Sequence, residues 1–182
     1  MSASTPPADP PTQAGSVPAG RRWHARLALA SALLGIFPAF SLSRTRLLAL
    51  KASGLRAGRS TWFWGIPKVT GPGPIASRLR IGSDCGFNDG CEFDLGAAVT
   101  IGNHVAVGHE VRFLTTLPGE NARIAAPITI GDGVWIGARC TIRGGVTIGA
   151  GSVIGAGMTV TEDVLPNTLL TGAKPVSLAK WR

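Results

Sequence analysis

Cysteine and histidine are scarce in this sequence, which contains three of each among its 182 residues. An odd number of cysteines cannot be fully paired, and the spacing of these three is not typical of a disulfide framework or a zinc site. The sequence offers no cluster of metal-ligating residues, so we expect no bound metal. Unpaired cysteines fit a reducing compartment, and we therefore expect the protein to be cytoplasmic.

The N-terminal part lacks a hydrophobic run that is long enough to span a membrane. The uncharged run from Leu27 to Ser43 is shorter than the roughly 20 residues that a spanning helix needs, and Pro38 interrupts it. An arginine-rich flank before a short apolar core is also the layout of a signal peptide, but residues 1–20 precede it and no clean cleavage site follows. We favour two short helices, at about 22–36 and 43–54. They either pack against the rest of the chain, lie on a membrane surface, or form a solvated face docked on a partner subunit.

Acidic residues are almost absent from the first half of the chain. Residues 1–83 contain eleven Lys or Arg and one Asp, whereas residues 84–182 contain seven basic and nine acidic residues. Each basic residue near an anionic surface contributes about 1 kcal/mol to binding. The eight basic residues between 21 and 59 could therefore hold the protein at the inner face of a membrane. A nucleic-acid interface would combine these residues with the aromatic run at 62–64, but no recognised binding motif is present, and we expect no nucleic-acid partner.

A period of six residues dominates the C-terminal half. From Ile130 to Thr161 an aliphatic residue followed by a small or polar one returns six times, at Ile130, Ile136, Ile142, Ile148, Ile154 and Val160. Neither the 3.6-residue period of a helix nor the 2-residue period of a strand describes this pattern. A six-residue repeat predicts a parallel β-helix, in which three hexads form one triangular coil with the aliphatic residue pointing inward. A second inward position lies four residues later, and it includes Cys85, Cys91 and Cys140, which we expect to be buried packing residues.

The rest of the chain is divided around this repeat. The first 20 residues are rich in Pro, Ala, Ser and Thr and cannot bury enough apolar surface to order themselves. Between Phe113 and Ile130 the repeat is interrupted by eleven extra residues, and such an interruption usually lies on the functional face. We predict the following segments: a disordered tail at 1–20, a basic amphipathic helical segment at 21–60, a linker and entry strand at 61–74 whose aromatics cap the coil, the β-helix at 75–166 with a loop at 114–129, and a C-terminal extension at 167–182.

Two stretches carry a resemblance to a known family. These are CGFNDGCEFDLGAAVTIGNHVAVGHEVRFLTT and ITIGDGVWIGARCTIRGGVTIGAGSVIGAGMTVTEDVLPNT. Over about residues 70–180 the chain resembles the hexapeptide-repeat acyltransferases, in particular the branch with maltose and galactoside O-acetyltransferases and capsule or colanic-acid acetyltransferases. The resemblance implies a left-handed parallel β-helix, a homotrimer, and acetyl-CoA bound in clefts between neighbouring subunits.

The same resemblance implies roles for individual residues. It places Trp135, Ala138, Ala156 and Thr161 along the groove for the pantetheine chain, and Lys180 near the CoA phosphates. Glu162 stands where relatives often have Lys, which removes one phosphate contact. Asn88 matches an acceptor-binding Asn, Asp94 could face the same cleft, and Arg123 matches an arginine of the loop. Asn and Asp at corners also suit tight β-helix turns without any function.

One departure concerns the general base. The family has a histidine in the loop after the LTT motif, but here that position falls on Pro118 or Leu117, neither of which accepts a proton. His109, with Glu110 beside it, is the better of the remaining histidines, and His104 lies on the preceding corner. His109 is one hexad away from the usual position, and adjacent corners are ~15 Å apart, whereas a base must come within ~3 Å of its proton. The base is therefore His109, His104 or no histidine at all.

We conclude that the sequence favours an acetyl-CoA-dependent O-acetyltransferase that acts directly, without a covalent intermediate, on a hydroxyl of a sugar or polysaccharide. The alternative is a catalytically impaired relative that serves as a trimeric CoA-binding or scaffold protein, because the loop histidine is absent. A metal enzyme like the γ-carbonic anhydrases would need three zinc-binding histidines, and the coils contain two. The fold alone does not separate these functions.

Overall fold

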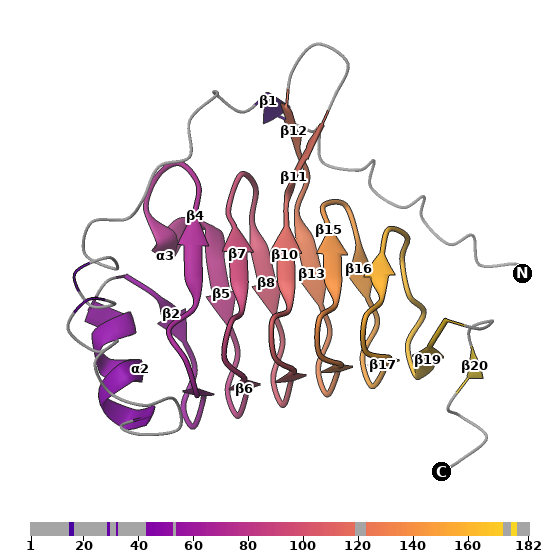
Figure 1. The fold of residues 1–182 in the computed structure, drawn as a ribbon, viewed down its shortest axis with the longest axis horizontal. Coiled ribbons are helices and arrows are strands. Elements are labelled where there is room, and N and C mark those ends of the chain that lie inside the picture. The colour runs from indigo at the N-terminus through magenta and orange to yellow at the C-terminus, as the bar shows by residue number, and fades with distance from the viewer. Residues whose placement is uncertain are drawn as a thin grey trace, which may run out of the picture.

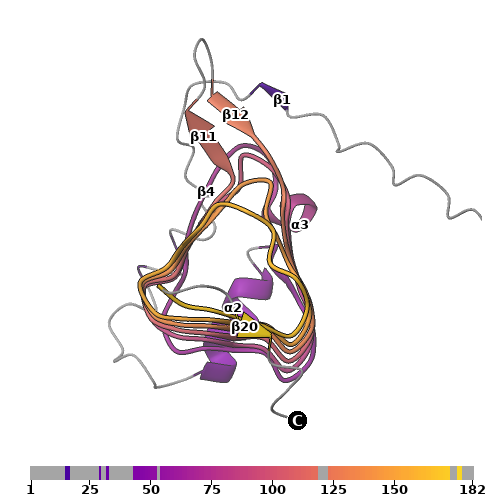
Figure 2. The same cartoon turned by 90° about the vertical axis from the view of Figure 1, so that its right-hand side faces the viewer.

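The chain folds into a β-helix of triangular cross-section. The computed structural model describes residues 15–16, 29, 32, 43–52, 54–118, 123–172 and 176–177. Short strands wind into a left-handed parallel β-helix of about five turns (Figure 1). Seen along its axis, the three sheets form the sides of a triangle (Figure 2). The predicted all-β fold class, with hexapeptide repeats and a short helical N-terminal segment, is confirmed.

Each side of the triangle is one sheet, named here after one of its strands. The β10 face contains β4 (Lys68–Thr70), β7 (Glu92–Asp94), β10 (Arg112–Leu114), β15 (Thr141–Arg143) and β18 (Thr159–Val160). The β8 face contains β2 (Arg56–Ala57), β5 (Leu79–Ile81), β8 (Val99–Ile101), β13 (Ile128–Ile130) and β16 (Thr147–Ile148). The β9 face contains β3 (Trp62–Phe63), β6 (Gly86–Phe87), β9 (Ala106–Val107), β14 (Trp135–Ile136), β17 (Val153–Ile154), β19 (Thr168–Leu170) and β20 (Val176–Ser177). Within these faces the strands pair in parallel, except that β20 runs antiparallel to β19.

Three edges join the faces. The chain passes from the β9 face to the β10 face at an edge that includes Asn88, called the Asn88 edge. It passes from the β10 face to the β8 face at an edge that carries the long loop, called the hairpin edge. It returns to the β9 face at an edge that includes His104, called the His104 edge. Residues that share an edge come from successive coils, so they lie above one another along the axis.

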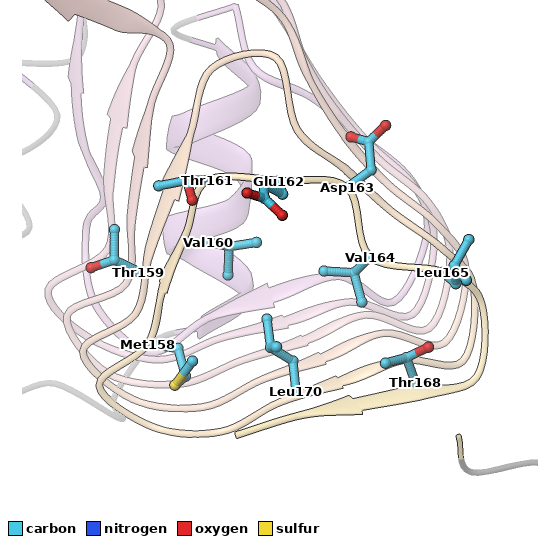
Figure 3. A pocket seen from close by; sticks show the side chains of 10 residues that line it. All are labelled: Met158, Thr159, Val160, Thr161, Glu162, Asp163, Val164, Leu165, Thr168 and Leu170. Carbon is cyan, nitrogen blue, oxygen red and sulfur yellow. The ribbon is translucent and has the colours of Figure 1, made fainter. Parts of the chain in front are cut away.

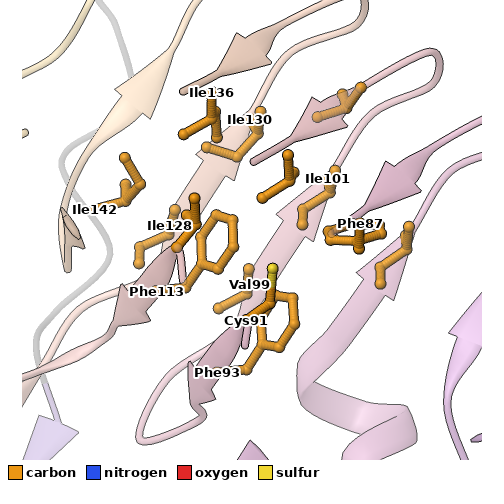
Figure 4. Close-up of a cluster of buried hydrophobic side chains, with 14 of the residues drawn as sticks. Phe87, Cys91, Phe93, Val99, Ile101, Phe113, Ile128, Ile130, Ile136 and Ile142 are labelled. Atoms are coloured by element: carbon orange, nitrogen blue, oxygen red, sulfur yellow. The ribbon is translucent and has the colours of Figure 1, made fainter. Parts of the chain in front are cut away.

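The hexad residues fill the interior of the coil. Phe87, Val107 and Ile136 are Cα partners in consecutive strands and are buried, as the six-residue period predicts. Aromatic rings extend this stack, because Phe93 and Phe113 lie parallel with centroids 4.8 Å apart. Figure 4 shows these side chains pointing into one continuous core. The interior is therefore set by one repeating position rather than by contacts between distant elements.

The second inward position is also buried. Cys85, Cys91 and Cys140 are buried free cysteines, as predicted. The Cys140 thiol donates to the Gly155 carbonyl at 3.0 Å, so the weak donor is used. Ser152 occupies the same position with no exposed surface, and its hydroxyl donates to the Leu165 carbonyl at 2.8 Å. A buried polar group at this position is tolerated because it is hydrogen-bonded.

The first coil begins earlier than predicted. We expected a linker at 61–74 and a β-helix from 75, but β2, β3 and β4 pair in parallel with β5, β6 and β7 and form a complete coil from Arg56. Phe63 and Val69 continue the six-residue spacing backward from Phe87 and are buried. The predicted boundary is wrong because this coil has aromatics and prolines where later coils have glycines. After β4 a four-residue helix, α3 (Ile75–Arg78), turns the chain toward β5.

A helix covers the N-terminal end of the core. The helix α2 (Ser43–Ala52) lies within the expected range 43–54, and it crosses the end of the triangle in Figure 2. Leu50 is 1% exposed and belongs to the core cluster. The expectation that the aromatics at 62–64 cap the coil is wrong for Phe63, which is stacked on Phe87 inside it. Of the helix expected at 22–36, only Leu29 and Ala32 belong to the described residues.

The interruption of the repeat forms a β-hairpin. Strands β11 (Thr116–Pro118) and β12 (Arg123–Ala125) pair antiparallel and project beyond the triangle from the hairpin edge (Figures 1 and 2). A third strand, β1 (Gly15–Ser16), pairs antiparallel with β12. This strand lies within the segment 1–20 that we expected to be disordered. An unpaired strand edge readily accepts an extended segment, whatever its composition.

Membrane-spanning helices are not found in the described part of the chain. None of its helices has both the length and the apolar character that crossing a bilayer requires.

Candidate functional site

The Asn88 edge brings together four of the residues to which the sequence assigned a role. Successive corner turns contain Asn88, His109, Ala138 and Ala156. The Arg139 amide donates to the His109 carbonyl at 2.7 Å, and the Gly157 amide donates to the Ala138 carbonyl at 2.8 Å. His109, Ala138 and Ala156 therefore form a column in which neighbours are one strand spacing, about 4.8 Å, apart.

Glycines allow the corners of this edge to approach closely. A Cβ at Gly137 would lie 2.6 Å from the Ala156 amide nitrogen, which no real side chain tolerates. The third residue of these turns adopts a positive φ, as in Glu110 at 57° and Gly157 at 74°. Glycine permits the close approach at Gly137 and the positive φ at Gly157, whereas Glu110 adopts a positive φ with a side chain. The result is a smooth edge with alanine methyl groups at Ala138 and Ala156.

Asn88 holds a buried atom without a partner. The residue is half-buried, and within the described residues its Oδ1 accepts no hydrogen bond although no solvent reaches it. An unsatisfied buried acceptor costs about 1–3 kcal/mol, so native structures usually supply a donor. A hydroxyl of a bound molecule or a group of a neighbouring subunit would satisfy it.

His109 is exposed at the turn of the third coil. Its neighbour Glu110 does not orient the imidazole, because the Glu110 carboxylate Oε2 accepts from Arg139 Nε at 3.0 Å. No hydrogen bond of the His109 ring is found among the described residues. The other coil histidine, His104, lies on the His104 edge, with Nδ1 4.0 Å from Asp84 Oδ2. The two histidines are therefore on different edges, and only His109 shares an edge with Asn88. His24 lies outside the described residues.

The hairpin edge holds a second group of predicted residues. The Asp94 carboxylate Oδ2 accepts from the Thr116 amide at 3.0 Å, and the Asp94 carbonyl accepts from the Thr115 hydroxyl at 2.5 Å. Asp94 therefore fixes the base of the hairpin. Arg123 is in β12, where its Cα partner is Pro118. Leu117 and Pro118, which the resemblance aligns with the family's histidine, are thus in β11. This strand pairs with β12, which contains Arg123.

The remaining predicted residues lie on the β9 face and at the C-terminal end. Trp135 projects from the β9 face and is 59% exposed. Thr161 and Glu162 line a cavity of about 550 Å³ at the C-terminal end of the coil, into which Val160 and Leu170 point (Figure 3). This cavity is the open end of the core and not a groove along an edge. Lys180 lies outside the described residues.

One exposed residue beside these was missed by the sequence analysis. Trp62 is 46% exposed and belongs to the same outer row of the β9 face as Trp135, through the Cα partners Gly86 and Ala106. A Cβ at Gly86 would lie 2.6 Å from Trp62 Nε1, so the indole ring covers this glycine. The six-residue spacing of Phe63 and Phe87 could have placed Trp62 on this face.

The predicted site residues therefore form two groups within one chain. Asn88, His109, Ala138 and Ala156 lie on the Asn88 edge, with Trp135 on the adjoining face, whereas Asp94 and Arg123 belong to the hairpin edge. The β10 face separates the two edges by ~15 Å. A single chain does not bring them into one cleft.

Comparisons with known proteins agree with this architecture. A family model described as the hexapeptide repeat of succinyl-transferase matches residues 127–162. The structure of the hexapeptide-repeat-containing acetyltransferase VCA0836 from Vibrio cholerae is 32% identical and superposes with a TM-score of 0.69, covering 85% of this chain and 91% of that chain. Another structure of that protein is a complex with acetyl-CoA.

Two further structures are similar. A galactoside acetyltransferase in complex with coenzyme A is 26% identical with a TM-score of 0.71, covering 87% of this chain and 82% of that chain. A maltose O-acetyltransferase from Clostridium difficile 630 is 23% identical with a TM-score of 0.68, covering 85% and 84%, and shows the fold alone. A comparison with curated proteins returns no match.

Proposed function

The chain belongs to the hexapeptide-repeat acetyltransferases, and from this membership we propose that it transfers an acetyl group from acetyl-CoA to a hydroxyl of a sugar or polysaccharide. The observation that carries the proposal is the arrangement of the Asn88 edge. There a candidate acceptor-binding amide, a candidate base and two small groove residues lie on successive coils. The acetyl-CoA and coenzyme A in the structures of two similar proteins support the donor.

Acetyl-CoA fits the smooth part of this edge. Ala138 and Ala156 leave room for a thin pantetheine chain, and the exposed indole of Trp135 offers an apolar wall beside them. Thr161 and Lys180 would complete the groove, as the resemblance to the family implies. Asn88 Oδ1 is closed to solvent as the residue stands, so an acceptor hydroxyl would bind it only after the amide turns outward.

The reaction would be a direct transfer. The acceptor oxygen attacks the thioester carbonyl, the C–S bond breaks, and the proton of the hydroxyl passes to a base and then to the departing CoA sulfur. An acyl-enzyme on cysteine is disfavoured, because burial raises the pKa of the Cys91 thiol to about 12 and also raises the pKa values of Cys85 and Cys140. A thiol that stays protonated and buried is a poor nucleophile.

The complete site would form between subunits of a homotrimer. The Asn88 edge and the hairpin edge of one chain are too far apart to meet, but the hairpin edge of one protomer could pack against the Asn88 edge of the next. The exposed Trp135 and Ile124, at 59% and 43%, fit burial in such an interface. Exposed apolar residues that gather near polar functional groups often mark interaction sites.

His109 is the proposed base. Two observations favour the alternative that the protein has no working base. Leu117 and Pro118 occupy the family position of the histidine, and no carboxylate within the described residues orients His109. A protein without a working base could keep the CoA groove and act as a trimeric scaffold. The two functions differ in turnover and not in CoA binding.

A thiol-release assay with acetyl-CoA and a panel of sugar and polysaccharide acceptors separates them. Wild type is compared with His109→Ala, with His104→Ala as the matched histidine control on another edge, and with Pro118→His. Loss of about 10²–10⁴-fold in kcat for His109→Ala alone supports the transferase and its base. An inactive wild type, an active Pro118→His and unchanged CoA binding by calorimetry support the scaffold. Absence of both turnover and CoA binding in all variants would refute both functions.

A further inference from the structure

A cluster of three cations lies at the N-terminal end of the β-helix. Lys51, Arg56 and Arg80, together with Leu55, Ala57 and Ile81, line a cavity of about 550 Å³. All three cationic residues are exposed, and no ion pair of theirs is found within the described part of the chain. Arg56 and Arg80 are Cα partners in neighbouring strands, about 4.8 Å apart. Like charges placed directly opposite each other destabilise a sheet. A bound anion would reduce the repulsion between Arg56 and Arg80.

The outer side of α2 adds an apolar residue to this cluster. Leu48 is 68% exposed and lies three residues before Lys51, so both are on the same side of the helix. Leu50 is buried in the core cluster, and the half-buried Leu47, four residues before Lys51, packs against this cluster. Leu48 therefore adds one exposed apolar side chain to this end of the molecule.

The surroundings of the cluster keep its field positive. Beyond Arg80 the β8 face continues outward with Thr100, Thr129 and Thr147, which carry no charge. In the sequence no acidic residue lies between Asp9 and Asp84. Asp84, on the His104 edge of the same coil as Arg80, is the first acidic residue that follows the cluster in the sequence.

The position of the cluster favours a docking surface over a substrate site. Arg80 is in β5 on the β8 face, whereas Ala138 and Trp135 lie two coils further along and on another side of the triangle. An acidic polysaccharide bound here would not reach the proposed acetyl donor, and it would have no use for an exposed leucine. A lipid surface uses both the cations and the apolar side chain.

We propose that this end of the β-helix docks on an anionic membrane, with Lys51, Arg56 and Arg80 contacting lipid phosphates and Leu48 entering the interface. The sequence range 21–59 contains eight basic residues, Lys51 and Arg56 among them, and no acidic residue. Membrane docking does not depend on catalysis, so an active enzyme and a catalytically inactive scaffold could both dock in this way. The catalytic edges extend away from the bilayer, because the coil axis leads from this end toward the later coils (Figure 1).

Co-sedimentation with lipid vesicles tests the proposal on the full chain. Vesicles of phosphatidylcholine mixed with phosphatidylserine are compared with vesicles of phosphatidylcholine alone, at low and high salt. The patch variant is Lys51→Gln, Arg56→Gln and Arg80→Gln combined. The control variant, Lys68→Gln, Arg112→Gln and Arg139→Gln combined, removes the same charge from the β10 face and the Asn88 edge. Circular dichroism and light scattering report folding and oligomeric mass for each.

We expect binding only to the anionic vesicles, weakening as salt is added. Each lost cation lowers the partition coefficient about fivefold, so the patch variant falls by about two orders of magnitude. The control should lose far less, and Leu48→Ser should lose several-fold at high salt, where the apolar contribution remains. Equal losses in patch and control variants would overturn the proposal. So would wild type that ignores vesicles but binds polygalacturonate through these residues, or a patch variant that changes the oligomeric mass while vesicle binding is unchanged.

Discussion

Single buried thiols make the stability of this protein sensitive to alkaline pH. Cys91 is 2% exposed, and burial raises its pKa from the ordinary value of 9.0 to about 12. Above pH 9 the unfolded chain loses this proton while the folded chain keeps it. The unfolded state then binds fewer protons, so the free energy of unfolding decreases as pH rises toward 12, by about 1.4 kcal/mol per pH unit for this group.

Urea unfolding at several pH values between 8 and 11 measures this effect. Cys91→Ala removes the thiol, so its stability should fall less steeply with pH than that of wild type, even though the substitution lowers stability at neutral pH. Cys85→Ala offers a second comparison, because burial also raises the pKa of that thiol. Identical slopes in wild type and Cys91→Ala would contradict the assignment.

Two glycines of the Asn88 edge allow the cost of close packing to be measured apart from the cost of backbone strain. A Cβ at Gly137 would lie 2.6 Å from the Ala156 amide nitrogen, whereas a Cβ at Gly157 meets nothing within 4 Å. Gly157 has a φ of 74°, so Gly157→Ala carries only the strain of the left-handed region, about 1–2 kcal/mol. Gly137→Ala forces neighbouring coils apart, which typically costs about 1–3 kcal/mol and here involves backbone on both sides. Thermal unfolding should show a larger drop in Tm for Gly137→Ala, and the opposite order would refute this account of the edge.

At the scale of elements, the β11–β12 hairpin depends on one carboxylate at its base. Asp94→Ala removes the acceptor of the Thr116 amide, while Asp94→Asn keeps an oxygen in place. Hydrogen bonds to charged groups contribute about 1.5–3 kcal/mol, so we expect amide hydrogen exchange in β11 to quicken at least tenfold in Asp94→Ala and less in Asp94→Asn. The core strand β10 should keep its protection.

Asp163→Ala is the matched control for this experiment. The Asp163 carboxylate Oδ1 accepts from the Thr147 amide at 2.7 Å in the same way, but in a later coil. Its removal should quicken exchange at Thr147 and leave β11 unchanged. Faster exchange of β11 in both variants would mean that the coil as a whole has loosened and that Asp94 has no special role for the hairpin.

The sequence predicts the elements whose side chains repeat and misses those that depend on pairing at a distance. The six-residue period fixes which residues point inward, so the burial of Phe87, Val107 and Ile136 follows from spacing alone. The corners follow from the same spacing, which is why Asn88 and His109 were expected on corners and share one edge. The pairing of Leu117 with Ile124 has no periodic signal, because a hairpin register depends on its turn.

The start of the β-helix was predicted wrongly for a different reason. Phe63 keeps the period, but Trp64 follows it where later coils have glycine, and aromatic residues near prolines resemble a linker. The role of Asp94 also escaped prediction, since its contact with Thr116 joins residues 22 positions apart in the sequence. Composition and spacing describe the repeat, whereas these contacts arise from the geometry of particular edges.

At the scale of the whole molecule, the separation of the two edges predicts that activity is shared between protomers. If the Asn88 edge of one subunit meets the hairpin edge of the next, His109→Ala damages one side of each site and Arg123→Ala the other. Each homotrimer should then turn over poorly in the thiol-release assay. When both chains are co-expressed, mixed trimers should recover about one third of wild-type activity, because one of their three interfaces combines two intact edges.

Tagging the two chains differently allows mixed trimers to be purified, and light scattering gives their mass. A mixture of wild type with either variant serves as the reference, with about half of the interfaces intact. Recovery would show that the site is built from two chains, because neither variant alone supplies both edges. Mixed trimers that stay as inactive as the parents would instead require a complete site within one protomer, and the hairpin would then have to reach across the β10 face of its own chain.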